Sequence, residues 1–270
     1  MSHPVRVAIN GASGRMGAAL CALLAADRRF ELLRAVVSAG SRLVGAPVFA
    51  EAADGLRYSC DWRDALPLDV VVDFSTPAGL GMALDYCLAA RVALVAGTTG
   101  SDAAMAERLS AAAAHIALLR TANFSLGVAV LTHLLRHAAA ALPDWDVEIV
   151  EAHHRGKRDA PSGTALALGQ AVRDGRAATA EEAPYVCNRE LATAPRPDGA
   201  IGFASVRGGD LVGEHTAMLI APGERLELVH RATDRQVFAR GALQAACWLS
   251  QRGPGWWSLD DMLARPRAGD

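Results

Sequence analysis

The sequence predicts an α/β protein in which a doubly wound parallel sheet is joined to a second, α+β domain built on a mixed or antiparallel sheet. An apolar strand at residues 5–10 runs directly into a glycine-rich turn and a helical pattern. Strands and helices then alternate as far as residue 125, whereas later strands follow one another without intervening helices. We therefore expect a first domain at 1–125, completed by 236–270, and a second domain at 126–235.

The turn after the first strand indicates a Rossmann-like, dinucleotide-binding domain. It reads G-x-x-G-x-x-G, in which the first glycine permits the tight turn and the second lets the backbone approach a pyrophosphate. The third glycine lets the helix pack closely on the strand. A purely structural turn is the alternative, but the position directly after the strand favours nucleotide binding. The predicted cofactor contacts are Gly11, Ala12, Ser13, Gly14, Arg15 and Met16.

The second strand, 30–37, ends without the acidic residue that binds the ribose of NAD in many such domains. Its end carries Ser38, which has a hydroxyl for hydrogen bonding to a 2′-phosphate, and Arg42 follows. Arg42 is either a charged partner of that phosphate or a solvated loop residue, and both interpretations stay open. The pattern favours NADPH as the cofactor, with NADH as the alternative.

Three later strands, 70–74, 93–96 and 116–119, end in loops that belong at the same edge of the sheet as the glycine turn. We expect Ser101 to cap the intervening helix, over 102–114. Because ligands bind at the carboxyl ends of parallel strands, these loops supply further cofactor candidates. They are Gly97, Thr98, Thr99, Thr121, Ala122, Asn123 and Phe124.

In the second domain we expect a long helix at 127–141 and several strands. The predicted strands lie at 147–150, 201–206, 216–220 and 225–231, and an apolar helix at 237–249 follows them. With Trp256 and Trp257, that helix should return to the first domain. An open sheet has edges and one face to cover, which favours association between copies of the chain.

Residues 151–164 carry the densest set of reactive side chains. His153, His154 and Lys157 precede a helix start, for which Pro161 suits the first turn and either Ser162 or Asp159 serves as cap. We expect the first amides of that helix, at Gly163 and Thr164, to bind an anion. A solvated basic loop is the alternative, but the nearby cofactor motif favours an acid/base site for a small dicarboxylate.

Composition excludes several other classes of protein. A formal net charge of -2 and a pI near 6.4 give no reason to expect nucleic acid or membrane partners. The five cysteines are scattered without a C-x-x-C pair, so no metal site is expected. The chain passes from its first four residues straight into a strand, without a signal sequence or spanning segment, so we expect a cytoplasmic protein.

Several segments resemble the dihydrodipicolinate reductase family. They include the glycine turn, Gly97-Thr98-Thr99-Gly100, the Asn123-Phe124-Ser125-Leu126-Gly127-Val128 stretch and the His-His-x-x-Lys-x-Asp-Ala-Pro-Ser-Gly-Thr segment. Gly202-Phe203-Ala204-Ser205-Val206-Arg207 and Gly213-Glu214-His215-Thr216 also resemble that family. The resemblance implies an NAD(P)H-dependent 4-hydroxy-tetrahydrodipicolinate reductase of lysine and diaminopimelate biosynthesis, commonly a homotetramer.

The resemblance also implies roles for individual residues. His153 corresponds to the proposed proton donor or acceptor and Lys157 to the second proton donor. The implied substrate contacts are His154, Gly163, Thr164 and Arg235. Two other functions remain as alternatives: a reductase of another imino or keto acid, and a non-catalytic sensor of nicotinamide nucleotides.

Overall fold

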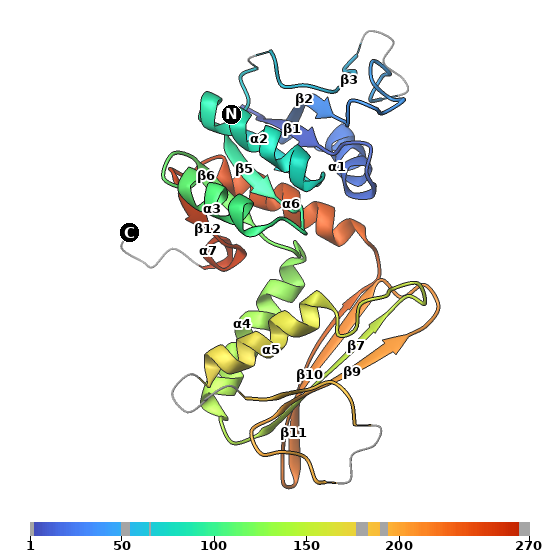
Figure 1. Cartoon of the computed structure of the whole chain (residues 1–270), viewed down its shortest axis with the longest axis vertical. Helices are drawn as coiled ribbons and strands as arrows, with labels where there is room; N and C mark the ends of the chain where they lie inside the picture. The colour runs from blue at the N-terminus through green and yellow to red at the C-terminus, as the bar shows by residue number, and fades with distance from the viewer. Residues whose placement is uncertain (1–2, 50–54, 65, 177–182, 190–193, 265–270) are drawn as a thin grey trace. The chain divides into compact units, whose positions relative to one another are not determined.

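The structure is a computed structural model that describes residues 3–49, 55–64, 66–176, 183–189 and 194–264 (Figure 1). The chain forms two compact units. The first comprises residues 1–124 and 236–270, and the second comprises residues 125–235. No helix of the described ranges combines the length and the apolar character that a membrane span requires.

The first unit is built on a parallel sheet of seven strands in the order β12-β6-β5-β4-β1-β2-β3. These strands are β1 (Val5–Asn10), β2 (Phe30–Val36), β3 (Tyr58–Ser59), β4 (Val70–Asp73), β5 (Ala93–Ala96), β6 (Ala117–Arg120) and β12 (Gly255–Trp257). The chain order reverses beside β1, where β4 and β2 flank it. In open α/β sheets such a reversal is where ligands bind, at the carboxyl ends of the strands. The predicted Rossmann-like fold class is confirmed.

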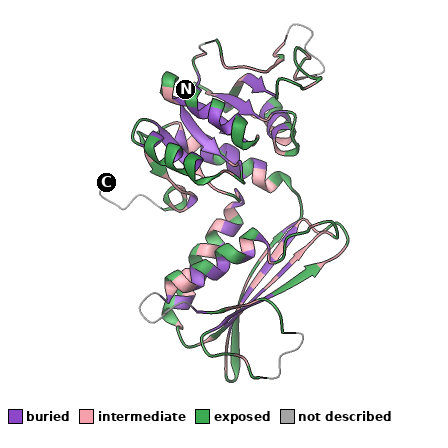
Figure 2. Cartoon of the chain, viewed as in Figure 1, coloured by how far each residue is buried: buried purple, intermediate pink, exposed green. Residues whose placement is uncertain are grey.

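Helices cover both faces of this sheet. They are α1 (Arg15–Ala26), α2 (Pro77–Ala90), α3 (Ala103–Ala112), α6 (Gln236–Leu249) and the short α7 (Leu259–Leu263). Helices α2 and α3 pack on one face, over Ala8, Val71, Leu94 and Leu118. Adjacent strand residues are also buried and point to the other face, where α1 and α6 pack together. Buried residues therefore run through every central strand (Figure 2).

The second unit is built on a mixed sheet of five strands in the order β11-β10-β7-β9-β8. The strands are β7 (Asp146–His153), β8 (Tyr185–Val186), β9 (Ile201–Arg207), β10 (Gly213–Ala221) and β11 (Glu224–Ala232). Helices α4 (Leu126–Ala141) and α5 (Gly163–Gly175) cover one face. Their cluster includes Leu135, Leu168 and Val172, which pack on Ile149 and Phe203 of the sheet.

The structure corrects several predicted boundaries. Asp102, rather than Ser101, caps α3 by accepting from the amide of Met105. Ser162 caps α5, so Pro161 precedes the helix instead of lying in its first turn. Strand β7 continues to His153, beyond the predicted end at Val150, because its pairing with β9 and β10 persists past the apolar run. The first histidine therefore lies on a strand and not in a loop.

Candidate active site

The glycine turn connects β1 to α1 at the carboxyl edge of the first sheet. Gly11 has a φ of +77°, and a Cβ there would lie 2.3 Å from the carbonyl oxygen of Phe74. Gly14 is the N-cap of α1, and no side chain caps this helix start. The first amides of α1 are therefore available to an anion, as a bound pyrophosphate requires.

Phe74 brings three of the predicted cofactor segments together. Its backbone lies against Gly11, and its ring would collide with a Cβ at Gly97, at 2.2 Å. The same ring packs edge-on against that of Phe124, with 5.3 Å between the centroids. The segments that follow β1, β5 and β6 thus meet, as predicted from the parallel sheet.

A buried carboxylate fixes one of these loops. Asp73, at the end of β4, is fully buried and accepts hydrogen bonds from Asn10 Nδ2 at 2.7 Å and from Thr98 Oγ1 at 2.5 Å. Burial raises the pKa of the Asp73 carboxyl, although the hydrogen bonds it accepts oppose that shift. Thr98 also accepts from the amide of Ser75 at 2.9 Å, so it serves to position the loop. Thr99 next to it is exposed.

The end of β2 lies beside the glycine turn, because the amide of Ala12 donates to the carbonyl of Val36 at 2.9 Å. Ser38 follows two residues later and is exposed, and Arg42 is exposed as well. No carboxylate occupies the residues directly after β2. This strand end is therefore free of the negative charge that would repel a 2′-phosphate.

The second candidate site lies where β7 ends and the segment to α5 begins. Glu151 and His153 are two residues apart on β7, so their side chains share the face that α4 and α5 cover. His153 Nδ1 lies 2.5 Å from Glu151 Oε2. The ring of His153 remains partly exposed, whereas the Glu151 side chain is fully buried.

Arg207, on β9, holds Glu151 by two parallel hydrogen bonds of 2.6 and 2.8 Å. Burial on its own would raise the pKa of Glu151, but the opposing hydrogen bonds, led by that of Arg207, bring the pKa to about 2. The carboxylate is therefore ionised at any working pH. Sequence reasoning gave neither residue a role in the site, although polar residues at the alternate positions 151 and 153 of a strand were a usable signal.

The other predicted residues of this site lie in the segment that follows. Lys157 is half-buried, and its Nζ lies 2.8 Å from Asp159 Oδ2. His154 is partly exposed, and Thr164 lies in the first turn of α5. A Cβ at Gly163 would meet nothing within 4 Å, so open space adjoins the start of that helix. Gly163 itself is exposed, so the amino end of α5 is accessible at this position.

Arg235 is distant in sequence but emerges from the same end of the sheet. It follows β11, in which Ala232 pairs with Gly213. Gly213 in turn lies against His153, because a Cβ there would be 3.1 Å from His153 Nε2. Arg235 itself is exposed, three residues beyond that pair.

His215, on β10, is a further member of this cluster that sequence reasoning did not single out as a site residue. It is buried, its Nε2 is hydrogen-bonded to Ser162 Oγ at 3.2 Å, and its ring packs edge-on to that of His153 at 5.3 Å. Burial and, secondarily, the charge of His153 lower the pKa of His215 to about 4. His215 is therefore neutral near pH 7.

The low pKa of His215 makes the stability of the protein depend on pH. An unfolded histidine titrates at 6.5, so between pH 6.5 and about 4 the unfolded chain binds a proton that the folded chain does not. Stability should be complete above pH 6.5 and fall by up to about 3 kcal/mol as the pH drops to 4. His230, whose pKa burial also lowers, acts in the same direction.

Urea unfolding of the wild type and of His215→Gln at a series of pH values tests this expectation. The variant should lose less stability than the wild type between pH 6.5 and 4.5. Equal losses in the two proteins would show that His215 does not contribute. The contribution of Glu151 falls in a separate window, because its pKa is depressed and its stabilisation is lost only as the pH falls from 4.5 towards 2.

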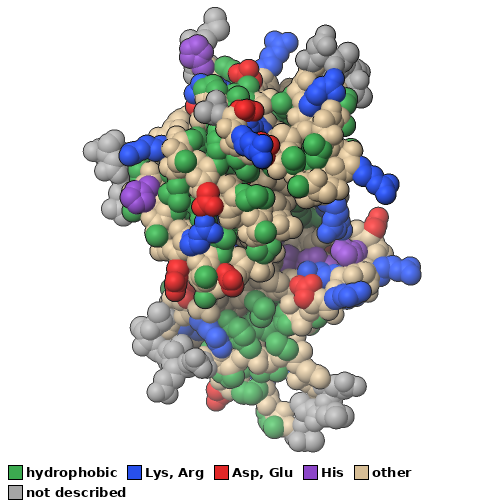
Figure 3. All heavy atoms as spheres, turned by 45° about the horizontal axis from the view of Figure 1, so that its top comes forward, with side chains coloured by type: hydrophobic (Ala, Val, Ile, Leu, Met, Phe, Trp, Pro, Cys, Tyr) green, Lys and Arg blue, Asp and Glu red, His purple; other side chains and the backbone are tan. Residues whose placement is uncertain are grey.

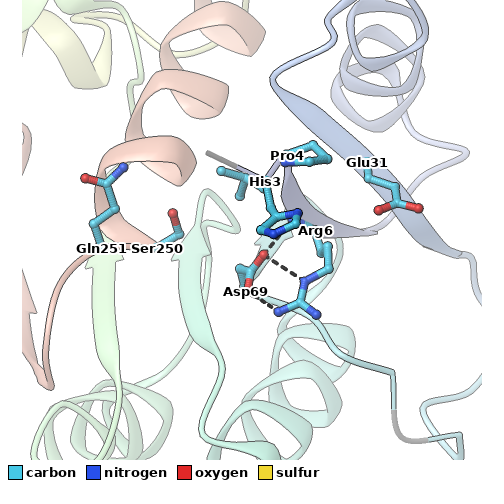
Figure 4. A pocket seen from close by; sticks show the side chains of 8 residues that line it. His3, Pro4, Arg6, Glu31, Asp69, Ser250 and Gln251 are labelled. Carbon is cyan, nitrogen blue, oxygen red and sulfur yellow. Dashed lines mark hydrogen bonds and ion pairs between the residues drawn. The ribbon is translucent and has the colours of Figure 1, made fainter. Parts of the chain in front are cut away.

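One pocket, of about 500 Å³, lies away from both candidate sites (Figure 4). It opens at the amino end of β1, whereas the glycine turn follows the carboxyl end. Arg6 in this pocket is already paired with Asp69, at 2.7 Å.

Within the described ranges no cluster of three or more His, Cys, Asp or Glu side chains is arranged to hold a metal ion.

Figure 3 shows histidine side chains with Lys, Arg and acidic side chains around them on one part of the surface. The fold, together with the relatives described next, identifies a nicotinamide-dependent oxidoreductase. Residues 5–124 match the family model for the dihydrodipicolinate reductase N-terminus, and residues 127–263 match that for its C-terminus. The chain belongs to the dihydrodipicolinate reductase family, which confirms the resemblance noted in the sequence.

Individual relatives agree with this membership. The chain is 45% identical over 268 residues to the 4-hydroxy-tetrahydrodipicolinate reductase of Cereibacter sphaeroides strain KD131, covering 97% of this chain and 99% of the relative. It is 47% identical over 264 residues to that of Thiobacillus denitrificans, covering 96% and 98%. The dipicolinate-bound dihydrodipicolinate reductase from Paenisporosarcina sp. TG-14 has the same fold, with a TM-score of 0.79 at 23% identity over 97% of this chain and all of that one.

Proposed function

We propose that the protein is a 4-hydroxy-tetrahydrodipicolinate reductase, which reduces the cyclic imine of lysine and diaminopimelate biosynthesis to tetrahydrodipicolinate. One observation supports the proposal above all: the chain is 47% identical to a reductase of that name and carries His153 and Lys157 in and directly before the segment that leads to α5. The glycine turn of the first unit, with its uncapped helix start, supports binding of the hydride donor that the reaction requires.

The residues of the first unit fit a nicotinamide dinucleotide. Gly11 and Gly17 are positions at which any Cβ would collide with backbone, at 2.3 and 2.2 Å. The uncapped start of α1 offers amides to the pyrophosphate, and residues 97–99 and 121–124 line the same edge. When bound, the cofactor supplies the hydride for the reduction.

The residues of the second unit fit a small dicarboxylate. In the proposed complex one substrate carboxylate binds the amides of Gly163 and Thr164, and the other binds Lys157, His154 and Arg235. In the free protein the Lys157 ammonium pairs with Asp159, so the substrate carboxylate replaces that partner. A related structure that holds dipicolinate, an aromatic dicarboxylate, supports this class of ligand.

The chain also supplies the proton that completes the reduction. Either Lys157 Nζ delivers it as the ammonium, or His153 Nε2 delivers it from the ring protonated on both nitrogens. The Lys157 ammonium also stabilises negative charge on the substrate. Holding these groups beside a bound substrate gives the second unit its role in catalysis.

Genetic complementation tests the proposed function. We expect the gene to restore growth without diaminopimelate to a bacterial strain that lacks its own reductase. The Lys157→Ala variant, expressed to the same level, should fail to do so. A folded, expressed wild-type protein that does not restore growth would instead favour a reductase of another imino or keto acid, or a sensor.

We further propose that NADPH is preferred over NADH, on the basis of the uncharged end of β2. The wild type should have a higher kcat/KM with NADPH, and Ser38→Asp should lower that value at least about tenfold while changing the NADH value little. Ser110→Asp is the matched control, since it adds the same charge near the carboxyl end of α3. Equal NADPH efficiency in Ser38→Asp and the wild type would rule out this role of the strand end.

We also propose a homotetramer in which the face of the second sheet opposite α4 and α5 contacts another copy. Val229, Thr216, Val150 and Ala204 form one row across that face. Light scattering should give the mass of four 28.2 kDa chains. Val229→Glu should dissociate it, because a charge would be buried, whereas Val44→Glu, on an equally exposed valine of the first unit, should not. If the tetramer persisted in Val229→Glu as it does in Val44→Glu, this face would be excluded as the contact between copies.

A further inference from the structure

We propose that Glu151 and Arg207 form a positioning pair that fixes the tautomer of His153 and anchors the segment carrying Lys157. Neither residue has to touch the substrate for this role. The effect on turnover rests on the reductase function proposed above, whereas the effect on the imidazole does not.

Both oxygens of the Glu151 carboxylate accept hydrogen bonds. Its Oε2 accepts from Arg207 Nη1 at 2.8 Å and from His153 Nδ1 at 2.5 Å. Its Oε1 accepts from Arg207 Nη2 at 2.6 Å and from the amide of Ser162 at 3.3 Å. A buried carboxylate is costly unless it is paired and hydrogen-bonded in this way. Its surroundings therefore hold it in one orientation.

An ionised carboxylate only accepts hydrogen bonds, so the atom of His153 that faces it must carry a proton. That atom is Nδ1, which leaves Nε2 as the nitrogen that gains and loses a proton. Nε2 points towards Gly213, the residue whose missing side chain leaves room there. The proton for the substrate, or its acceptor, is thereby assigned to one nitrogen.

Arg207 extends this control to the neighbouring catalytic segment. Its Nη2 also donates to the backbone carbonyl of Asp159 at 2.7 Å. Asp159 is the residue whose carboxylate pairs with Lys157. The bond from Glu151 to the amide of Ser162 fixes the N-cap of α5 in the same way. One ion pair thus joins His153, the Lys157 segment and the helix start.

The charged and titratable groups around His153 come from three strands and the following segment. They are Glu151 on β7, Arg207 on β9, His215 on β10 and Lys157 after β7. His215 is neutral near pH 7 and adds no charge beside the ring of His153. Within this set, Glu151 is the anion in direct contact with that ring. No other group in this set accepts a hydrogen bond from His153 Nδ1.

The tautomer can be measured without turnover. Long-range ¹H–¹⁵N correlation of the ¹⁵N-histidine protein at pH 8 distinguishes the two tautomers, and His153→Gln identifies the signals by their loss. We expect the wild-type ring to carry its proton on Nδ1. A wild-type ring protonated on Nε2 would overturn the proposal directly, whatever the activity of the protein.

Variants then separate positioning from a general structural role. Breaking a buried pair by one substitution leaves an uncompensated charge, whereas replacing both partners by apolar residues is often tolerated. Glu151→Met/Arg207→Met should therefore fold and bind NADPH, shift His153 towards the Nε2-protonated tautomer, and lower kcat at least about a hundredfold. KM should change by less than about threefold.

Two single variants serve as comparisons. Arg207→Lys keeps Glu151 charged, so it should retain the Nδ1 proton and lose less activity than the double variant. Glu148 also lies on β7 and is also paired with arginines, but its side chain is on the opposite face of the sheet from Glu151. Glu148→Gln should therefore leave the tautomer of His153 unchanged. A folded double variant with kcat within about threefold of the wild type would refute the positioning role.

Failure of this inference is distinguishable from failure of the proposed function. If the wild type shows the Nδ1-protonated ring but no reductase activity, the pairing stands and the assigned reaction is wrong. If the wild type is an active reductase with the other tautomer, the reaction stands and the positioning pair is wrong.

Discussion

Replacing Lys157 with alanine is expected to lower kcat by about a hundredfold or more, with little change in NADPH binding. The ammonium is half-buried in the segment after β7, where it pairs with Asp159. In the proposed complex it binds the substrate and stabilises charge that develops during reduction. Alanine removes both interactions, whereas the nucleotide turn lies on the other unit and is unaffected.

Arg158→Ala is the matched control for this prediction. It removes one positive charge from the adjacent, exposed position, so it should reproduce any effect of net charge alone. Steady-state kinetics and NADPH titration of both variants provide the measurement. If Lys157→Ala kept the turnover of Arg158→Ala, Lys157 would not be the residue that holds and protonates the substrate.

His153→Ala is expected to have a loss of the same order, about a hundredfold or more in kcat. His153 is tied to Glu151, so its Nε2 is available for proton transfer. Removing the ring also exposes the Glu151–Arg207 pair, so folding has to be checked by circular dichroism. The exposed His133 on α4 provides the comparison variant His133→Ala.

The pH dependence of the two variants distinguishes their roles. If His153 delivers the proton, the pH profile of kcat in Lys157→Ala should keep the titration that His153→Ala lacks. Loss of the same titration in both would mean that the two groups act as one coupled site. Near-normal turnover in both variants would overturn the assignment of the site.

Local sequence patterns predicted the parts of the fold that depend on local rules. The sequence alone shows the glycine turn and the alternation of apolar strands and helices up to residue 124. It also shows that later strands follow one another without intervening helices. Strands β3, β8 and β12 were not predicted, because two or three residues carry no periodicity. Their pairing is set by neighbouring strands.

The sequence identified the reactive side chains of the candidate site, but not which side chains pair with one another. His153 and Lys157 stand out in the sequence, and their segment was found. Arg207 meets Glu151 across 56 positions of the chain, through the register of β7 with β9. No local pattern contains that pairing. Glu151 was missed because the strand was taken to end with its last apolar residue, whereas β7 continues for three more.

The most direct test of the proposed function is cofactor oxidation by the purified protein, with the substrate generated in place. Pyruvate and aspartate semialdehyde are supplied with the preceding synthase, and absorbance at the wavelength of reduced nicotinamide is followed. We predict oxidation of NADPH that requires the synthase and is about a hundredfold or more slower in Lys157→Ala. Folded protein that binds NADPH but oxidises neither NADPH nor NADH under these conditions would contradict the reductase assignment.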